Sequence, residues 1–457
     1  MNFDSHRAGL LLHPTSLPSG TLVDADRWLD FLHAAGFGVW QMLPLGIPLA
    51  GLSPYQCASA FAVNPALFPA AAVDLHGFAD WCSRQAHWLE DFARFTIIKA
   101  EQGGASWTDW PVALRDRDAQ TLAAFDLSHA DKLNAVMVEQ YRVALHWQRI
   151  RAQAAARGIQ LFGDMPIFVA HDSADVWAQR ALFLLDDAGH PTVVTGVPPD
   201  YFSATGQRWG NPHYNWAAMA ADGFAWWRAR LAAHFEWFDL VRIDHFRGLL
   251  AAWTIPAGEA TAIHGEWVAA PGAALLQAIS QEGGADERGE LPLVAEDLGI
   301  ITPEVTALRH QFGLPGMAVL QFAFDHHADN PHKPENVHPD TVYYTGTHDN
   351  DTTLGWWRAL PDEARQQVMR QLDVHDPAAV PDAMIDTVLQ SRAALAILPL
   401  QDVLRLGSEA RMNTPGTGNG NGNWTWRFAW DALPSELASN LLEQLQKAHR
   451  CETKPKP

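Results

Sequence analysis

The chain has 457 residues, of which 48% are hydrophobic and 18% charged, and its formal net charge is −20. This composition is that of a folded globular protein, and the acidic balance argues against a nucleic-acid partner, which would need clustered Lys and Arg. No run approaches the roughly 18 apolar residues of a membrane span, and the polar start, followed by only a short apolar run, predicts no secretory signal. We therefore expect a cytoplasmic protein with no membrane partner.

Eight short apolar runs recur along the chain, and most of them lead into polar or charged residues. Helix-like segments such as Asp131–Ala156 and Pro361–Leu372 lie between most of these runs. Alternating strands and helices predict an α/β protein with a parallel sheet, and eight such units predict a single (β/α)8 TIM barrel over residues 1–457. The runs are Leu10–Leu12, Gly38–Leu43, Ile159–Gly163, Leu240–Ile243, Leu293–Ala295, Met317–Leu320, Thr341–Tyr344 and Leu395–Leu400.

Two connections are too long for simple loops of a barrel. They cover residues about 48–131 and about 169–225. The second is rich in Pro, Gly and aromatic residues, as expected of a shaped loop over a ligand. Long insertions on the catalytic face usually form subdomains or lids, and we expect both segments to do so.

Three acidic residues end predicted strands four, five and seven, where barrel chemistry is found. They are Asp244, Glu296 and Asp349. Retaining cleavage of a glycosidic bond needs an ionised carboxylate as nucleophile and a protonated one as acid. Arg242, two positions before Asp244, lies on the same face of its strand and is expected to keep that carboxylate charged. A less polar pocket or the charge of Asp244 would keep Glu296 protonated, and Asp349 beside His348 suits the binding of sugar hydroxyls.

Other interpretations of these acids remain open on composition and spacing alone. Acids at strand ends also cap helices or form ion pairs with Arg. A metal site is a further alternative, because Asp, Glu and His are all metal ligands. No HxH or HxxxH pair accompanies the three acids, which favours carboxylate chemistry without a metal.

Taken in order, the motifs of the chain resemble the 4-α-glucanotransferases of glycoside hydrolase family 77, called amylomaltases or disproportionating enzymes. The resemblance covers residues from about Gly9 to Arg427. The matching segments are Leu12–Pro18, Ser53–Tyr55, Gly163–Pro166, Gly196–Trp216, Arg242–His245, Ala295–Gly299 and Thr347–Asn350.

The resemblance implies a (β/α)8 barrel that acts on α-1,4-glucans and maltooligosaccharides, as a monomer or small homo-oligomer, without an organic cofactor. It assigns the nucleophile to Asp244, the general acid/base to Glu296 and stabilisation of the transition state to Asp349. It also implies an acceptor-side loop at Val197–Trp209. The sugar-binding positions that it implies are Arg242, His348, Ser53, Tyr55, Asp164, Tyr201, Asn350 and Asn423.

Two other functions compete with glucan transfer. A hydrolase on the same fold would use the same carboxylates, and it would differ by producing new reducing ends. A catalytically silent glucan-binding protein is the second alternative, although binding alone does not require a buried acid at Glu296. Transfer is distinguished from both because it forms longer products while the number of reducing ends stays constant.

Overall fold

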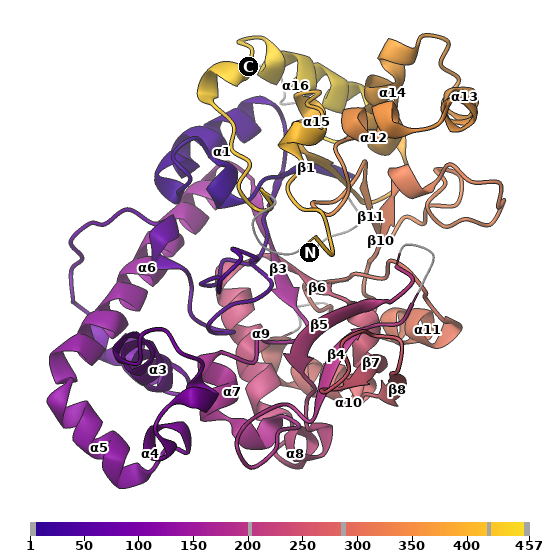
Figure 1. Ribbon diagram of the computed structural model, residues 1–457. Helices are drawn as coiled ribbons and strands as arrows, with labels where there is room; N and C mark the ends of the chain where they lie inside the picture. The colour runs from indigo at the N-terminus through magenta and orange to yellow at the C-terminus, as the bar shows by residue number, and fades with distance from the viewer. Residues whose placement is uncertain (1–5, 200–202, 285–288, 418–421, 452–457) are drawn as a thin grey trace.

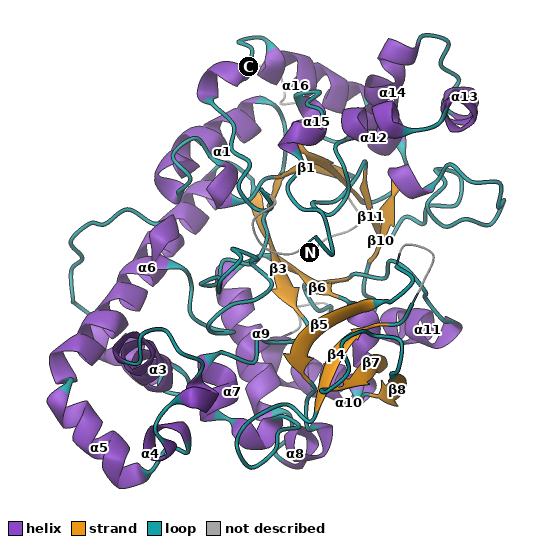
Figure 2. Cartoon of the chain, viewed as in Figure 1, coloured by secondary structure: helices purple, strands orange, loops and turns teal. Residues whose placement is uncertain are grey.

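The computed structural model describes residues 6–199, 203–284, 289–417 and 422–451, and its centre is a sheet of eight parallel strands (Figures 1 and 2). The strands pair in the order β10-β11-β12-β1-β2-β3-β6-β9. The backbone N–H of Ala295 at the end of β9 donates to the carbonyl of Pro315, just before β10, at 2.8 Å. This bond brings the two edge strands together, so the predicted (β/α)8 barrel is confirmed.

Each of the eight barrel strands overlaps a predicted apolar run. Their bounds are β1 Arg7–Leu11, β2 Val39–Gln41, β3 Gln160–Pro166, β6 Leu240–Asp244, β9 Leu293–Ala295, β10 Gly316–Val319, β11 Thr341–Tyr344 and β12 Leu395–Pro399.

The residues of these strands fit the close packing of the barrel. Every residue of β11 and β12 is buried, as expected of parallel strands covered on both faces. Gly163 in β3 has a steric reason to be glycine, because a Cβ there would lie 2.3 Å from the ring of Phe238. Phe238 closely precedes β6, so this glycine lets β3 and β6 pack closely where they carry site residues.

Helices surround the barrel in the described part of the chain. The long α6 buries one residue in every three or four, including Tyr141, Trp147 and Ile150, which is the spacing of a single apolar face. The predicted helices at 131–156 and 361–372 correspond to α6 and α13. None of the helices in the described ranges combines the length and apolarity that a membrane crossing requires.

The helix bounds are α1 Ala25–Ala34, α2 Phe78–Arg84, α3 Leu89–Glu101, α4 Val112–Arg115, α5 Ala119–Ser128, α6 Ala130–Ala156, α7 Ala174–Ala178, α8 Trp216–Ala221, α9 Ala225–Trp237, α10 Gly272–Ile279, α11 Pro303–Gln311, α12 Thr353–Ala359, α13 Asp362–Gln371, α14 Val380–Gln390, α15 Leu400–Val403 and α16 Leu437–Lys447.

The connection between β2 and β3 forms a helical lobe. Helices α3, α4 and α5 gather beside α6, away from the barrel axis (Figure 1). The start of this connection is fixed to α6 by the buried Gln140, whose side chain accepts from the N–H of Val63 at 3.1 Å and donates to its carbonyl at 2.9 Å. Because both polar atoms of Gln140 are satisfied, this buried amide can hold the loop without a large desolvation cost.

A second, antiparallel sheet in the order β5-β4-β7-β8 stands beside the barrel. Its strands are β4 Val193–Val197, β5 Gln207–Pro212, β7 Ala251–Pro256 and β8 Glu266–Ala269. The first two come from the insertion at 169–225, but β7 and β8 come from the connection between β6 and β9, where the sequence analysis expected no strand. The segment after Asp244 therefore continues directly into this accessory sheet.

Candidate active site

The first part of the site is an ion-pair network at the ends of β3 and β6. Arg242 on β6 pairs in register with Asp164 on β3. Its Nη1 donates to both carboxylate oxygens of Asp164, at 2.8 and 2.7 Å, and its Nη2 donates to Oδ1 of Asp244 at 2.7 Å. The contact between Arg242 and Asp244 is the one expected from their spacing of two residues in a strand.

The second part of the site is the carboxylate of Glu296, which two backbone N–H groups hold. Oε2 accepts from the N–H of His245 at 2.7 Å, and Oε1 accepts from the N–H of Leu298 at 2.8 Å. His245 has the left-handed backbone conformation, with φ of 53°, which is uncommon for a residue other than glycine. The backbone thus changes direction directly after Asp244, at the residue whose N–H meets Glu296.

Burial changes the protonation of this pair of carboxyl groups. Withdrawal from solvent and the nearby charge of Asp244 raise the pKa of Glu296 to about 7, although Arg242 and the two N–H groups oppose the change. Burial also raises the pKa of Asp244 to about 6, together with the charges of Asp164 and Asp349. Arg242 was expected to keep Asp244 charged, and it does lower this pKa, but burial outweighs it. The guanidinium hydrogen bond to Asp244 favours the ionised form of this carboxyl group.

The third carboxylate, Asp349, lies after β11 in a more open position. Its side chain is 45% exposed, and its Oδ1 lies 3.4 Å from Nε2 of His348. Asn413 donates from Nδ2 to the same oxygen at 2.6 Å, and Arg411 donates from Nη2 to the backbone carbonyl of Asp349 at 2.6 Å. Both residues lie after β12, so the last barrel connection fixes the Asp349 loop.

Tyr55 joins the two sides of the site. Its hydroxyl donates to Oδ2 of Asp164 at 2.7 Å and lies 2.9 Å from Nε2 of His348. Its ring stacks on His348, with centroids 5.4 Å apart, and Trp424 lies 5.9 Å from both rings. This group of three rings gives the site an aromatic surface beside Asp349, and aromatic surfaces suit contact with sugar rings.

The remaining residues predicted to bind sugar have local roles in the structure. Asp164 is 1% exposed and is bonded within the protein, as described above. Ser53 accepts from the N–H of Tyr55 at 3.3 Å. Oδ1 of Asn350 accepts from Thr347, and Oδ1 of Asn423 accepts from the N–H of Thr414 at 3.0 Å, so each shapes its own loop. Tyr201 lies outside the described residues.

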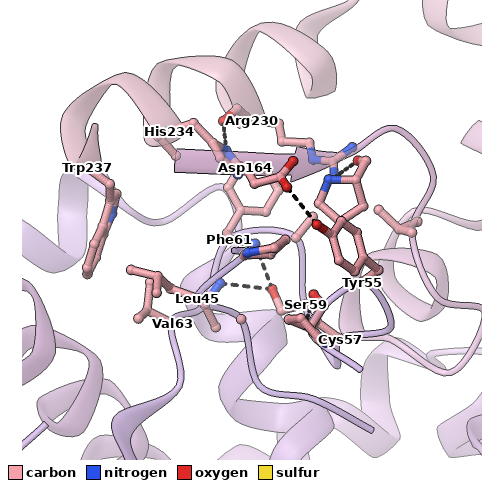
Figure 3. Close-up of a pocket in the computed structure, with 18 of the residues that line it drawn as sticks. Leu45, Tyr55, Cys57, Ser59, Phe61, Val63, Asp164, Arg230, His234 and Trp237 are labelled. Atoms are coloured by element: carbon pink, nitrogen blue, oxygen red, sulfur yellow. Dashed lines mark hydrogen bonds between the residues drawn. The ribbon is translucent and has the colours of Figure 1, made fainter. Parts of the chain in front are cut away.

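A pocket lies beside this network, between residues 44–63, the segment 164–170 and helix α9 (Figure 3). Tyr55 and Asp164 form one side of it, while Arg230 and His234 of α9 form another. The three predicted catalytic carboxylates do not belong to its lining. The pocket thus borders the site through Tyr55 and Asp164 and is not the place where the three carboxylates meet.

Sequence reasoning missed Asn413 and Arg411 as site residues. Asn413 stands 64 residues after Asp349 in the chain, and no spacing rule connects them. The available signal was the end of the eighth strand, where polar residues are expected to face the site. In the described ranges, no three side chains of His, Cys, Asp or Glu are grouped so that they could share a metal ion.

The barrel and the carboxylates at its strand ends are typical of enzymes that cleave glycosidic bonds. Comparison with known proteins agrees: a family model described as 4-alpha-glucanotransferase, glycoside hydrolase family 77, matches residues 11–76 and 69–432. The chain therefore belongs to this family of enzymes.

Individual relatives match over nearly the whole chain. The 4-alpha-glucanotransferase of Thermus thermophilus is 46% identical, with 94% of this chain and 95% of that protein covered. The enzyme of the same description from Synechocystis is 43% identical, with 91% and 92% covered. The solved structure of amylomaltase from Streptococcus agalactiae in complex with acarbose is 30% identical and superposes with a TM-score of 0.92, covering 98% of this chain and 100% of that one.

Proposed function

We propose that this enzyme transfers segments of α-1,4-glucans by a retaining double displacement, with Asp244 as nucleophile, Glu296 as general acid/base and Asp349 as the group that stabilises the transition state. The carboxylate of Asp244 attacks C1 of the donor sugar, while Glu296 protonates the leaving 4-oxygen. The 4-hydroxyl of an acceptor glucan then gives its proton to Glu296 and attacks C1, which releases Asp244.

One observation carries this proposal. Two neighbouring strands, β6 and β9, carry carboxyl groups with different environments, Asp244 at the end of β6 and Glu296 directly after β9. Asp244 is bonded to a guanidinium and its side chain is 31% exposed, whereas Glu296 is 9% exposed, and burial together with the charge of Asp244 raises its pKa. Two carboxyl groups whose environments separate their pKa values are the arrangement that acid and nucleophile roles require.

Transfer rather than hydrolysis requires that an acceptor sugar, and not water, reaches C1. The insertions support this part of the proposal. Trp209, at the end of the predicted acceptor-side loop, meets the ring of His245 edge-on at 4.8 Å. We propose that segments about 48–131 and about 169–225 act as subdomains or lids over the catalytic face, and that Trp209 contributes an acceptor-side wall next to Asp244.

Incubation with pure maltotriose tests the function. The products are separated by size and the reducing ends are counted over time. Longer maltooligosaccharides together with glucose, at a constant number of reducing ends, are the expected result. Shorter sugars alone, with rising reducing ends, would instead establish a hydrolase. Binding of maltotriose or longer glucans without any product would establish a silent binding protein.

We also propose that the enzyme works in the cytoplasm as a monomer or small homo-oligomer. Cell fractionation and size-exclusion chromatography with light scattering test these two points separately from the activity.

A further inference from the structure

Arg247 connects the two loops that carry the catalytic pair. It lies in the short 3₁₀ turn Phe246–Leu249, three residues after Asp244, and it is 8% exposed. Its Nη1 donates to the backbone carbonyl of Ile300 at 2.7 Å. Ile300 stands four residues after Glu296, so this bond ties the loop after β6 to the loop after β9.

The accessory sheet covers the guanidinium of Arg247. Its Cζ lies 3.7 Å from the ring centroid of Trp267 on β8. Trp267 packs edge-on against Trp253 of β7 at 5.3 Å, and Nε1 of Trp253 donates to the carbonyl of Ala262 at 2.9 Å. The ring that covers the guanidinium is therefore held by the accessory sheet.

The charge of Arg247 has an unusual environment for a buried arginine. Across the described residues, no carboxylate forms an ion pair with it, and its buried Nε has no hydrogen-bond partner. A backbone carbonyl and the face of Trp267 are what compensate the charge. Burial of a cation without a counterion destabilises the folded protein. A neutral side chain would join the two loops with a smaller desolvation penalty.

The loop that Arg247 anchors is also the loop that bonds Glu296. The N–H of His245 donates to Oε2 of Glu296, and the N–H of Phe246 donates to its backbone carbonyl at 3.1 Å. A shift of the 245–250 turn would therefore change the hydrogen bonding of the acid itself.

We propose that Arg247 is a positioning residue for Glu296, with Trp267 as its support from the accessory sheet. The inference rests on the proposed function, in which Glu296 is the acid/base. Because β4 and β5 of the same sheet flank the predicted acceptor-side loop, the sheet connects that loop with the placement of the acid. Trp267 and Arg247 form the point of contact.

Two donor substrates that differ in their need for a general acid provide the test. Maltotriose has a poor leaving group and needs protonation by Glu296, whereas release of fluoride from α-glucosyl fluoride does not. We expect Arg247→Ala to lower kcat/KM for maltotriose by about 30-fold and for the fluoride by less than about 3-fold. Loss of the His245 hydrogen bond raises the pKa of Glu296, so the alkaline limb of the pH profile should move to higher pH.

Conservative variants sharpen the test. Trp267→Phe keeps an aromatic face and should retain nearly full activity, whereas Trp267→Ala should show a weaker form of the Arg247→Ala pattern. Arg247→Lys keeps the charge but loses the planar group and should recover part of the activity. The matched control is Arg27→Ala, because Arg27 stacks on Trp430 at 4.1 Å and belongs to neither catalytic loop. Arg27→Ala should leave kcat/KM for both donor substrates and the pH profile unchanged.

Equal losses for the two donors with an unchanged pH profile would overturn the proposal, as would wild-type kinetics in Arg247→Ala. If circular dichroism shows that Arg247→Ala does not fold, Trp267→Ala replaces it in the test. The ratio of kcat/KM for maltotriose to kcat/KM for the fluoride in Trp267→Ala then decides whether the proposal holds. If the wild-type enzyme hydrolyses maltotriose instead of transferring it, the proposed function fails. The donor comparison would still decide whether Arg247 positions the acid.

Discussion

The two sides of the site differ in how they hold their charged groups. On the β3–β6 side, the side chains of Arg242 and Asp164 are 6% and 1% exposed and share two hydrogen bonds. On the β11 side, the side chain of Asp349 is 45% exposed and accepts a hydrogen bond from Asn413. The first side is an ion-pair network in which Arg242 and Asp164 are buried and Asp244 is 31% exposed, while the second is a more solvated carboxylate supported by a loop.

This difference indicates a division of labour. A nucleophile and an acid must keep separate pKa values, and only groups shielded from water can shift each other strongly. A carboxylate that contacts sugar hydroxyls must instead stay accessible. We therefore expect substitutions on the buried side to cost more activity than substitutions around Asp349, and the following predictions test that order.

The largest effect is expected from Asp244→Asn. The amide cannot form the glycosyl ester, so we expect turnover of maltotriose to fall by about 10⁴-fold or more, with the circular dichroism spectrum unchanged. Asp239→Asn is the matched control, because Asp239 closely precedes the same strand and pairs with Arg151 at 2.8 Å. It should keep normal activity. Turnover near the wild-type rate in Asp244→Asn would remove this residue as the nucleophile.

Glu296→Gln should show the next largest effect. We expect maltotriose turnover to fall by about 10³-fold, because the leaving oxygen is no longer protonated. With α-glucosyl fluoride the first step needs no acid, whereas the second still needs the base. A glucosyl group should therefore accumulate on the peptide that contains Asp244, as detected by mass spectrometry. Equal losses with both donors and no labelled peptide would contradict the roles assigned to both residues.

The buried side was also the part of the site that the sequence predicted best. Arg242 and Asp244 are two residues apart and therefore lie on the same face of a strand. Glu296 directly follows the next strand of the barrel. The two-residue period of a strand and the order of strands in the barrel are therefore enough to bring these residues together. The eight strands were predictable for a related reason. Each is a short apolar run that is buried on both faces, which gives a strong signal in sequence.

The rest depends on contacts that no local pattern encodes. Asn413 reaches Asp349 across 64 residues through an irregular loop. The strands β7 and β8 were missed because they belong to a connection, and their pairing with β4 is set by tertiary packing. The net direction of the Asp244 pKa was missed because it depends on burial and on two other carboxylates, and none of these is visible from the Arg-x-Asp spacing.

Asp164→Asn tests whether the buried network itself matters. An asparagine cannot balance the charge of Arg242 as Asp164 does, so we expect kcat to fall by about 10²-fold through misplacement of Asp244. The free energy of unfolding should fall by up to about 3 kcal/mol, because a buried ion pair loses one partner. Chemical denaturation measures this free energy of unfolding. Asp239→Asn is the control, because loss of its more exposed ion pair should lower the free energy of unfolding by less. Unchanged activity and stability would show that Asp244 alone is sufficient to hold Arg242.

The pH profile tests the separation of the two carboxyl groups. Burial raises the pKa of Asp244 to about 6 and that of Glu296 to about 7. The nucleophile is ionised above its pKa and the acid is protonated below its own. We therefore expect kcat/KM for maltotriose to be highest between these values and to fall about tenfold per pH unit on either side. A profile that stays flat from pH 5 to 9 would contradict this assignment.

The smallest effect is expected from Asn413→Ala, and it is also the sharpest test of the contrast between the two sides. Because Asp349 is partly exposed, water can replace the lost donor, so we expect kcat/KM to fall by only about fivefold, equivalent to about 1 kcal/mol. Asn413→Asp should cost more than Asn413→Ala, because it places a second negative charge against Asp349. Asn336→Ala is the control, since Asn336 donates to the carbonyls of Ala328 and Asn330 in its own loop.

The comparison of Asn413→Ala with Asp164→Asn then decides between two views of the site. If the Asn413 variant loses as much activity as the Asp164 variant, Asp349 depends on a fixed position as strictly as Asp244 does, and its exposure does not reflect a looser role. If its loss is small and appears mainly in KM, Asp349 serves sugar binding more than the placement of the reacting groups. The kcat and KM of the two variants, measured on maltotriose under the same conditions, separate these outcomes because misplacement of the nucleophile lowers kcat itself.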